Sequence, residues 1–301
     1  MMEGKILIGG HRGRGATDDE NVHNRNIGRV LPLENTLDSF KKALDFGVDA
    51  DFIETDAVAT KNGGEIVLIH SNDTSTHIKE KKFNTTGETF IDAMTAQEVA
   101  SLKTGSDGSG RIPTLLELLE AVEKFPSKFI NIELKGIQGT RREAPPLVEP
   151  LLKIIKNKGF PLDRILFSSF SLNTLDELKR RTFNQAKIGV LFCKTNEYLL
   201  KDENYLPFTK ENVDHVLKRF PSLYALIPEI NELISNPLSR DIVKRKLKIF
   251  TYTSPEVSSP SEKEYKEKVR NALLICAACD LELGFITDYI EEMRACTKRC
   301  K

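Results

Sequence analysis

Short runs of β-branched and aromatic residues alternate along the chain with longer segments in which apolar residues recur every three or four positions. This alternation predicts βα units, in which consecutive strands lie parallel and a helix connects them. We expect eight such strands, at residues 5–9, 51–55, 129–134, 165–169, 187–192, 224–229, 248–253 and 284–289. Eight units favour an α/β fold with a closed TIM-type (β/α)8 barrel, and an open doubly wound sheet is the alternative.

The segments between these strands have the amphipathic pattern of helices. In residues 34–47, for example, Phe40, Ala43 and Leu44 share one face, and Gly47 is expected to end the helix. Further helices are expected at residues 114–125, 148–159, 172–181 and 263–278. Each of them can serve as the connection between two parallel strands.

One apolar run breaks this alternation and predicts a β-hairpin on the barrel rim. It follows the second strand after the Asn- and Gly-containing loop 61–64, which is too short to join parallel strands. If Thr60 faces Glu65 across the turn, the returning strand brings His70 to within roughly 5 Å of Asp56. A residue distant in sequence therefore becomes the neighbour of a carboxylate at a strand end.

Charge and length limit the classes of partner and the number of domains. The 44 Lys and Arg residues balance the 44 Asp and Glu residues, and the basic clusters at 79–82 and 244–248 are short, so we expect no nucleic-acid partner. No stretch of about 18 uncharged apolar residues exists, and the first ten residues lack the features of a signal peptide. We therefore expect a cytoplasmic protein without stable membrane insertion, formed as a single domain over residues 1–301. The sequence leaves its oligomeric state open.

The five cysteines are an odd number and are concentrated near the C-terminal end. Without an export signal, this count argues against a disulfide framework. The spacing of Cys276, Cys279, Cys296 and Cys300 admits a structural zinc site as one interpretation. We favour the other, in which Cys276 and Cys279 lie on one face of a helix and pack as small apolar residues.

Polar residues stand at the ends of several expected strands, where the active site of such a barrel lies. They are His11, Arg12, Glu54, Asp56, His70, Glu133, Lys135 and Asp288. Glu54 and Asp56 are two positions apart, so both project to one side of their strand, as two carboxylates sharing one hard cation must. Each residue alone has an ordinary structural explanation, and the prediction of a site depends on their convergence on one face. We expect Asp288 to cap the segment that follows it rather than to support a metal.

This set of side chains suits phosphodiester cleavage. Carboxylate oxygens are ligands for Mg²⁺ or Ca²⁺, and the sequence does not choose between these two ions. A bound cation polarises a phosphoryl oxygen, while Arg12 and Lys135 offset the phosphate charge. His11 and His70 can then act as base and acid on opposite sides of the phosphorus.

In their order along the chain, these residues resemble the motifs of the glycerophosphodiester phosphodiesterase family. The matching motifs are His11-Arg12-Gly13, Glu34-Asn35-Thr36, Glu54-x-Asp56, TKNGGEIVLIH ending at His70, RIPTLLELL at 111–119, Glu133-x-Lys135, Ser168-Ser169-Phe170 and the ITDY that ends at Tyr289. The resemblance spans Gly9 to about Tyr289 and implies a TIM-type barrel.

The resemblance also implies a role for each strand-end residue. The implied roles are cation binding by Glu54, Asp56 and Glu133, acid/base catalysis by His11 and His70, and phosphate binding by Arg12 and Lys135. Glu34 is a candidate supporting residue. The family carries an inserted segment after the hairpin, and residues 74–111, rich in Gly, Ser and Thr, would supply it here.

The chain departs from the family pattern at several positions. Ser71 stands where the family usually has Asp, and Leu33 stands where it usually has Pro. The chain has no Trp, so Phe250 and Tyr252 occupy the penultimate strand, where a Trp is common. The first loop, residues 14–33, is similar in length to that of the eukaryotic glycerophosphocholine-cleaving branch. These departures bear on the orientation of the second histidine and on the choice of substrate.

The resemblance implies metal-dependent hydrolysis of small-molecule glycerophosphodiesters, such as glycerophosphocholine or glycerophosphoethanolamine, to glycerol 3-phosphate and an alcohol. Direct attack by water and attack by the substrate's own hydroxyl through a cyclic phosphate are both open. One alternative is a phospholipase D-type enzyme acting on lysophospholipids or sphingolipids, although the first loop is too polar for an acyl chain. Another is a catalytically silent barrel that binds phosphodiesters.

Overall fold

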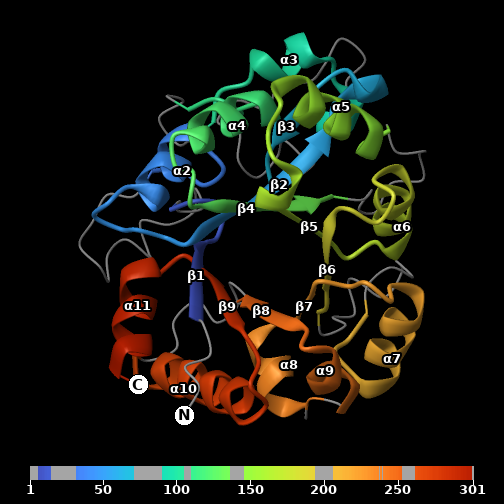
Figure 1. Cartoon of the computed structure of the whole chain (residues 1–301). Helices are drawn as coiled ribbons and strands as arrows, with labels where there is room; N and C mark the ends of the chain where they lie inside the picture. The colour runs from blue at the N-terminus through green and yellow to red at the C-terminus, as the bar shows by residue number, and fades with distance from the viewer. Residues whose placement is uncertain are drawn as a thin grey trace.

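Pairing of the first strand with the second closes a barrel of eight parallel strands, with helices around its outside (Figure 1). The computed structural model describes residues 6–14, 32–70, 90–104, 110–135, 146–193, 206–236, 238, 240–252 and 262–299. The barrel strands are β1 (Ile6–Gly10), β2 (Phe52–Ala59), β4 (Phe129–Leu134), β5 (Ile165–Ser169), β6 (Lys187–Leu191), β7 (Ala225–Ile227), β8 (Lys248–Tyr252) and β9 (Leu283–Thr287). The TIM-type barrel is confirmed, and closure rules out the open sheet.

The rim hairpin is also present. Strand β2 is longer than expected because it continues past the barrel to pair antiparallel with β3 (Ile66–Leu68). The Thr60 N–H donates to the Glu65 carbonyl at 2.9 Å, and the Ile69 N–H donates to the Asp56 carbonyl at 3.0 Å. These bonds confirm the expected register, which returns the chain after β3 to the level of Asp56.

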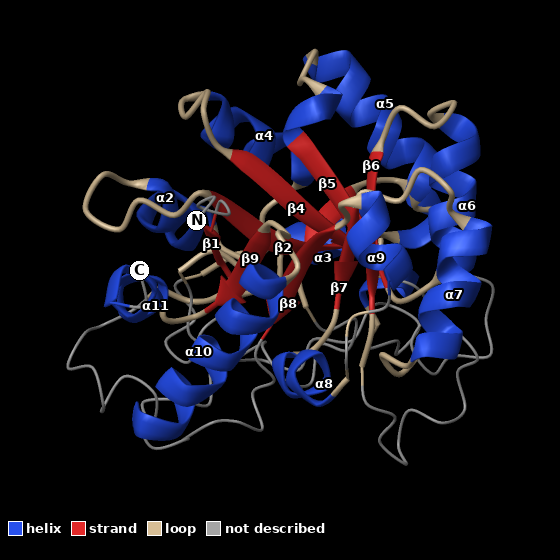
Figure 2. Cartoon of the chain, turned by 60° about the horizontal axis from the view of Figure 1, so that its bottom comes forward, coloured by secondary structure: helices blue, strands red, loops and turns tan. Residues whose placement is uncertain are grey.

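Helices follow the barrel strands and pack on the outside of the barrel (Figure 2). They are α2 (Leu37–Leu44), α3 (Ala96–Ala100), α4 (Leu115–Glu123), α5 (Val148–Lys158), α6 (Leu172–Arg181), α7 (Lys210–Arg219), α8 (Ile230–Ser235), α9 (Arg240–Arg245), α10 (Glu262–Ala278) and α11 (Ile290–Arg299). Short 3-10 turns are η1 (Lys61–Gly63), η2 (Ile91–Ala93) and η3 (Leu162–Arg164). All five helices expected from the sequence are present.

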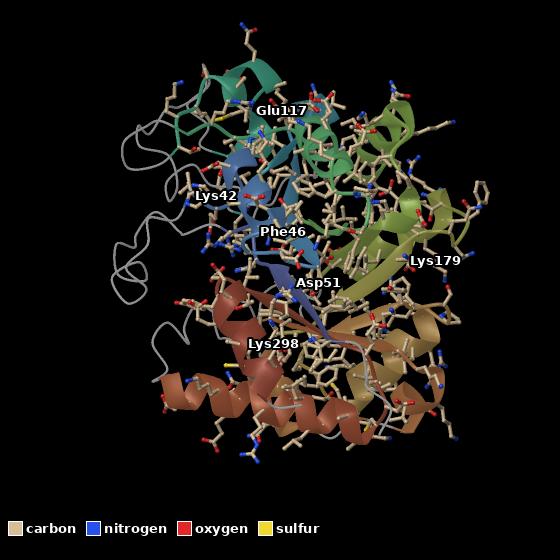
Figure 3. All side chains as sticks on the ribbon, turned by 60° about the vertical axis from the view of Figure 1, so that its left-hand side comes forward. Lys42, Phe46, Asp51, Glu117, Lys179 and Lys298 are labelled. Atoms are coloured by element: carbon tan, nitrogen blue, oxygen red, sulfur yellow. The ribbon has the colours of Figure 1, made fainter. Side chains whose placement is uncertain are left out.

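Helix α2 shows both why these segments are helical and where the sequence was misleading. Phe40 and Leu44 are buried on its inner face, whereas Lys42 extends outward (Figure 3). The expectation that Gly47 ends this helix is wrong. Asp45 already leaves the helical conformation, at φ −64° and ψ 152°, so the helix ends at Leu44, before the chain reaches the glycine.

Aromatic rings fill the part of the barrel interior that lies toward the amino-terminal ends of the strands. The rings of Phe52 and Phe129 stack with centroids 4.6 Å apart, and Phe250 meets the Phe52 ring edge-on at 5.4 Å. A Cβ atom at Gly9 would lie 2.2 Å from the Phe52 ring, and one at Gly284 would lie 2.3 Å from Phe250. These glycines therefore make room for the rings. The polar side chains lie in the other part of the interior, toward the carboxyl-terminal ends of the strands.

The inserted segment packs on the outer face of the rim hairpin. Its described residues, 90–104 and 110–111, include η2 and α3. They share a small apolar core with the hairpin, formed by Val58, Val67, Ile69, Ile91, Met94, Val99, Leu102 and Ile112. The insert thereby holds the strand that leads to His70, while Ser71 and most of the first loop lie outside the described residues.

No helix among the described residues is long and apolar enough to cross a membrane. Cys276 is buried in the main core, and Cys279 packs against that core, as expected for small apolar residues. Within the described part of the chain, the one group of side chains placed to hold a metal ion consists of carboxylates, with no cysteine. Cys300 lies outside the described residues.

Candidate active site

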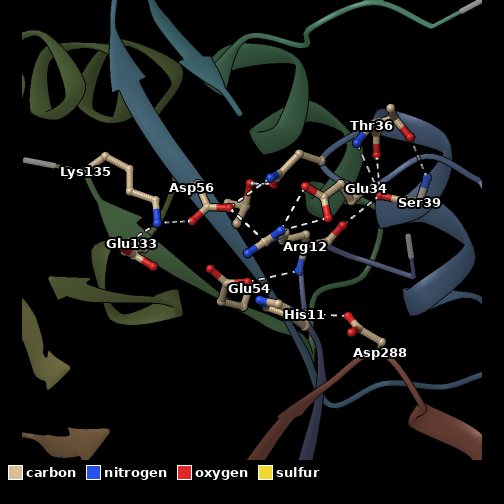
Figure 4. Close-up of polar contacts among 12 residues, drawn as sticks. His11, Arg12, Glu34, Thr36, Ser39, Glu54, Asp56, Glu133, Lys135 and Asp288 are labelled. Atoms are coloured by element: carbon tan, nitrogen blue, oxygen red, sulfur yellow. Dashed lines mark hydrogen bonds and ion pairs between the residues drawn. The ribbon is translucent and has the colours of Figure 1, made fainter. Parts of the chain in front are cut away.

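Three carboxylates expected to share a cation come together at the carboxyl-terminal mouth of the barrel. The oxygens of Glu54, Asp56 and Glu133 lie within 4.8 Å of one another (Figure 4). Glu54 and Asp56 face the same way because they are two apart on β2, and Asp56 is the cross-strand partner of Glu133 on β4. Glu54 is 4% exposed, Asp56 is 1% exposed and the Glu133 side chain is 12% exposed, so solvent has little access to the three charges. We refer to them below as the carboxylate triad.

Burial and mutual repulsion strain the carboxylate triad electrostatically. Burial, followed by the nearby Asp56 charge, raises the pKa of Glu54 to about 8. Burial also raises the pKa of Glu133. At Asp56 burial acts in the same direction, but Lys135, His70 and Arg12 outweigh it and hold its pKa well below the usual range. The described residues thus supply three hard oxygen donors that suit a divalent cation, and such an ion would favour the ionised form of Glu54.

Lys135 lies against the carboxylate triad. Its Nζ atom is 2.7 Å from Glu133 and 2.9 Å from Asp56. The Lys135 N–H also donates to the Ala57 carbonyl, which continues the β2–β4 ladder past the strand end. Burial acts to lower the pKa of Lys135, but the two carboxylates raise it above its ordinary value. Lys135 is therefore a fixed positive charge at the place expected from the sequence.

Arg12 occupies the same mouth in a left-handed backbone conformation, at φ 52°. This turn lets its N–H donate to Glu54 Oε2 at 2.9 Å. The guanidinium Nη1 donates to both Glu34 oxygens, at 2.8 and 2.9 Å, and Nε lies 3.5 Å from Asp56 Oδ2. Glu34 thereby holds Arg12 beside the carboxylate triad.

Asn35 belongs to the site, although its role was not expected from the sequence. Its Nδ2 donates to Asp56 Oδ2 at 2.9 Å, and its Oδ1 accepts a bond from the Thr55 hydroxyl at 2.8 Å. Its N–H donates to the Arg12 carbonyl at 3.0 Å. The available signal was its position immediately before a Thr that caps α2, together with the tolerance of Asn for left-handed φ, here 51°. Asn35 fixes the rotamer of a carboxylate at the centre of the site.

His11 contacts the opposite end of the chain. Its Nδ1 atom lies 2.9 Å from Asp288 Oδ1, just beyond the last barrel strand. The sequence did not predict this bond between the Asp288 carboxylate and His11. Burial lowers the pKa of His11, but the Asp288 charge opposes burial and the net direction is upward. A carboxylate on Nδ1 leaves the other ring nitrogen for a substrate.

His70 arrives at the site from the rim hairpin. The register of the hairpin, with the Ile69 N–H bonded to the Asp56 carbonyl, brings His70 level with the mouth. Burial, followed by the positive charge of Lys135, lowers its pKa well below the ordinary value. The two histidines therefore differ in environment, since His11 has a carboxylate partner and His70 faces cations.

A small hollow, partly open to solvent, lies beside His70. Its lining comes from the segment that leads into α2, the end of β3 with the two residues after it, and the end of the insert with the residue that follows: Leu33, Glu34, Asn35, Thr36, Leu68, Ile69, His70, Thr104, Arg111 and Ile112. The eight polar residues that the sequence placed at the ends of several strands thus surround one mouth of the barrel. The hollow lies next to them. The arrangement is suited to binding a metal and a phosphate and to moving protons.

The sequence profile of the glycerophosphoryl diester phosphodiesterase family matches residues 11–291. Comparison with curated proteins found no match. Among solved structures, the fold is similar to a candidate glycerophosphodiester phosphodiesterase from Galdieria sulphuraria, with 23% identity, a TM-score of 0.68, and 97% of this chain and 98% of that chain covered. A candidate glycerophosphoryl diester phosphodiesterase from Silicibacter pomeroyi is 18% identical, with a TM-score of 0.66 and coverage of 99% and 94%. A glycerophosphodiester phosphodiesterase from Parabacteroides distasonis is 17% identical, with a TM-score of 0.61 and 99% of each chain covered.

Proposed function

Because the chain belongs to the glycerophosphoryl diester phosphodiesterase family, whose members are phosphoric diester hydrolases, we propose that it cleaves glycerophosphodiesters at this mouth with the help of a divalent cation. The substrates are small molecules such as glycerophosphocholine or glycerophosphoethanolamine, and the products are glycerol 3-phosphate and an alcohol. The observation that carries this proposal is the buried carboxylate triad with Lys135 and Arg12 beside it.

The carboxylate triad would hold Mg²⁺ or Ca²⁺, since all three donors are hard oxygens. The ion, when bound, supplies a Lewis acid for a phosphoryl oxygen. Lys135 and Arg12 offset the negative charge that the phosphate brings into a buried site. Bonds to carboxylates hold the Lys135 ammonium and the Arg12 guanidinium in position before the substrate binds, so these side chains need little reorganisation during the reaction.

The two histidines carry the proton transfers in this proposal. His11 and His70 reach the mouth from β1 and from the rim hairpin, so they approach it from different sides. Their environments favour opposite proton states, which is the arrangement that an acid/base pair requires. Attack by water and attack by the substrate's own hydroxyl use the same pair, and a cyclic phosphate among the products would indicate the second route.

A substrate panel tests this proposal. The purified protein is incubated with glycerophosphocholine, glycerophosphoethanolamine and lysophosphatidylcholine, with and without a chelator, and glycerol 3-phosphate and choline are measured. We expect glycerol 3-phosphate from the first two substrates only when metal is present. Choline released from lysophosphatidylcholine without glycerol 3-phosphate from any substrate would favour a phospholipase D-type enzyme instead. No product from any of them would favour a silent phosphodiester-binding barrel.

A further inference from the structure

Two buried polar side chains lie below the carboxylate triad without a hydrogen-bond partner among the described residues. Both the amide nitrogen and the amide oxygen of Asn131 on β4 are unpartnered, and so is the hydroxyl of Ser168 on β5. Asn131 is 1% exposed and Ser168 is fully buried. Buried polar groups without partners are rare in native proteins, so these two require an explanation.

Their position follows from strand register. Asn131 is the cross-strand partner of Glu54, and Ser168 is the partner of Glu133. Cross-strand partners and residues two apart face the same side of a sheet, so both side chains point into the barrel with the carboxylate triad. Two residues before Asn131 on the same face, Phe129 belongs to the aromatic rings that fill the amino-terminal part of the barrel. Asn131 and Ser168 therefore form a thin polar layer between those rings and the carboxylate triad.

A role in fold stability does not account for this layer. A buried amide or hydroxyl stabilises a fold when it is bonded, and it destabilises the fold when it has lost water without gaining a partner. Thr251, on β8, illustrates the ordinary case. It is 1% exposed, and its hydroxyl donates to the Pro228 carbonyl at 3.0 Å. Groups that break this rule concentrate at functional sites, where their partner arrives with a ligand.

We propose that Asn131 and Ser168 form the floor of the cation site and hydrogen-bond to the oxygen ligands of the bound ion, whether these are carboxylate oxygens or waters. An amide can both donate and accept, and a hydroxyl can donate, so the pair matches ligands of either kind. Both residues are positioning residues, because they act on the ion through its ligands. The inference rests on the metal dependence proposed above. Such outer partners usually contribute roughly tenfold to a hundredfold to metal affinity.

The test is thermal unfolding of metal-free protein during titration with Mg²⁺ or Ca²⁺, a readout that does not use activity. In Asn131→Leu, the unpartnered amide is replaced by an apolar group of similar size. The metal-free variant is therefore expected to melt at the same temperature as the parent or higher. The metal concentration at which the melting temperature rises is expected to increase by roughly tenfold or more.

Two further variants make the outcome decisive. Ser168→Ala removes a single atom and is expected to shift the metal titration in the same direction, so it tests the proposal even where Asn131→Leu folds poorly. Thr251→Val is the matched control, since it loses a satisfied bond. It is expected to melt lower without metal and to keep the metal response of the parent.

Three results would overturn the inference. A metal titration unchanged in both Asn131→Leu and Ser168→Ala would show that neither residue acts on the ion. A large fall in the metal-free melting temperature of Ser168→Ala would show that its hydroxyl is bonded within the fold. A parent protein whose melting temperature does not respond to either metal would contradict the proposed metal dependence as well as this inference. The first two results leave the metal dependence intact, so the two failures can be distinguished.

Discussion

The imidazole of His11 and the carboxylate of Asp288 lie 2.9 Å apart, Nδ1 to Oδ1, and join the ends of the first and last barrel strands. The pair is 277 positions apart in sequence and neighbouring in space because β1 pairs with β9. The bond fixes the ring so that the other nitrogen remains for substrate. Asp288 is therefore expected to position a catalytic histidine.

Asp288→Ala is expected to lower kcat roughly tenfold or more with a small change in KM, because proton transfer depends on the orientation of the imidazole. Steady-state kinetics on glycerophosphocholine measure both constants. Glu291→Ala is the control, since it breaks the neighbouring ion pair with Arg14 at the same end of the barrel. Equal kcat values for Asp288→Ala and Glu291→Ala would show that Asp288 does not position His11.

The same replacement should change the pH profile. The Asp288 charge raises the pKa of His11 against the opposing effect of burial, so its removal lowers that pKa. Whether His11 gives or accepts the proton, the limb of the profile that reports its titration moves to lower pH. The measurement is kcat against pH from about pH 5 to pH 9. A limb that stays in place would show that the titrating group is not His11.

Glu54 gives a prediction about the metal-free protein. Its pKa in the folded state is about 8, against an ordinary 4.5, so the folded state holds a proton that the unfolded state has already lost. The free energy of unfolding is therefore reduced progressively as pH rises from 4.5 to about 8. Glu54→Gln removes this effect, so the metal-free variant should gain at least about 2 °C in Tm over the parent at pH 8, and less at pH 5. A larger gain at pH 5 would contradict this assignment.

Asn35 allows the side chain and the backbone to be tested separately. Its amide bonds Asp56, and its φ of 51° favours Asn or Gly over Ala. Asn35→Gly and Asn35→Ala should both lower turnover roughly tenfold, because Asp56 loses its donor. The Ala variant should also lose about 1 kcal/mol of stability relative to the Gly variant through backbone strain. Wild-type turnover in Asn35→Gly would rule out a positioning role for the amide.

The histidines should separate activity from stability. His11→Ala and His70→Ala are each expected to reduce turnover roughly a hundredfold or more, the usual contribution of a general acid or base. Both should remain folded, because each histidine is only half-buried and lies at the barrel mouth. Turnover and Tm are measured together for each variant. A variant that stays folded and keeps near-parent turnover would remove that histidine from the mechanism.

Sequence patterning predicted the parts of this structure that depend on local periodicity. Period-two spacing correctly placed Glu54 and Asp56 on one face, and loop length predicted the hairpin that returns His70. Two features of the structure could not be predicted from these local patterns. The partner of Asp288 depends on barrel closure across the whole chain, which no local pattern encodes. The stop of α2 was misplaced because the chain already takes an extended conformation at Asp45, before the glycine.

The most direct test of the account is the dependence of glycerophosphocholine hydrolysis on added metal, measured for the parent and for Glu133→Gln. The parent should lose activity after rigorous chelation and regain it with Mg²⁺ or Ca²⁺, because the carboxylate triad is the proposed metal site. Glu133→Gln, with one charged ligand removed, should need at least about tenfold more metal for half of its own maximal rate. Full activity of the parent after rigorous chelation, or identical metal requirements in the two proteins, would contradict the account.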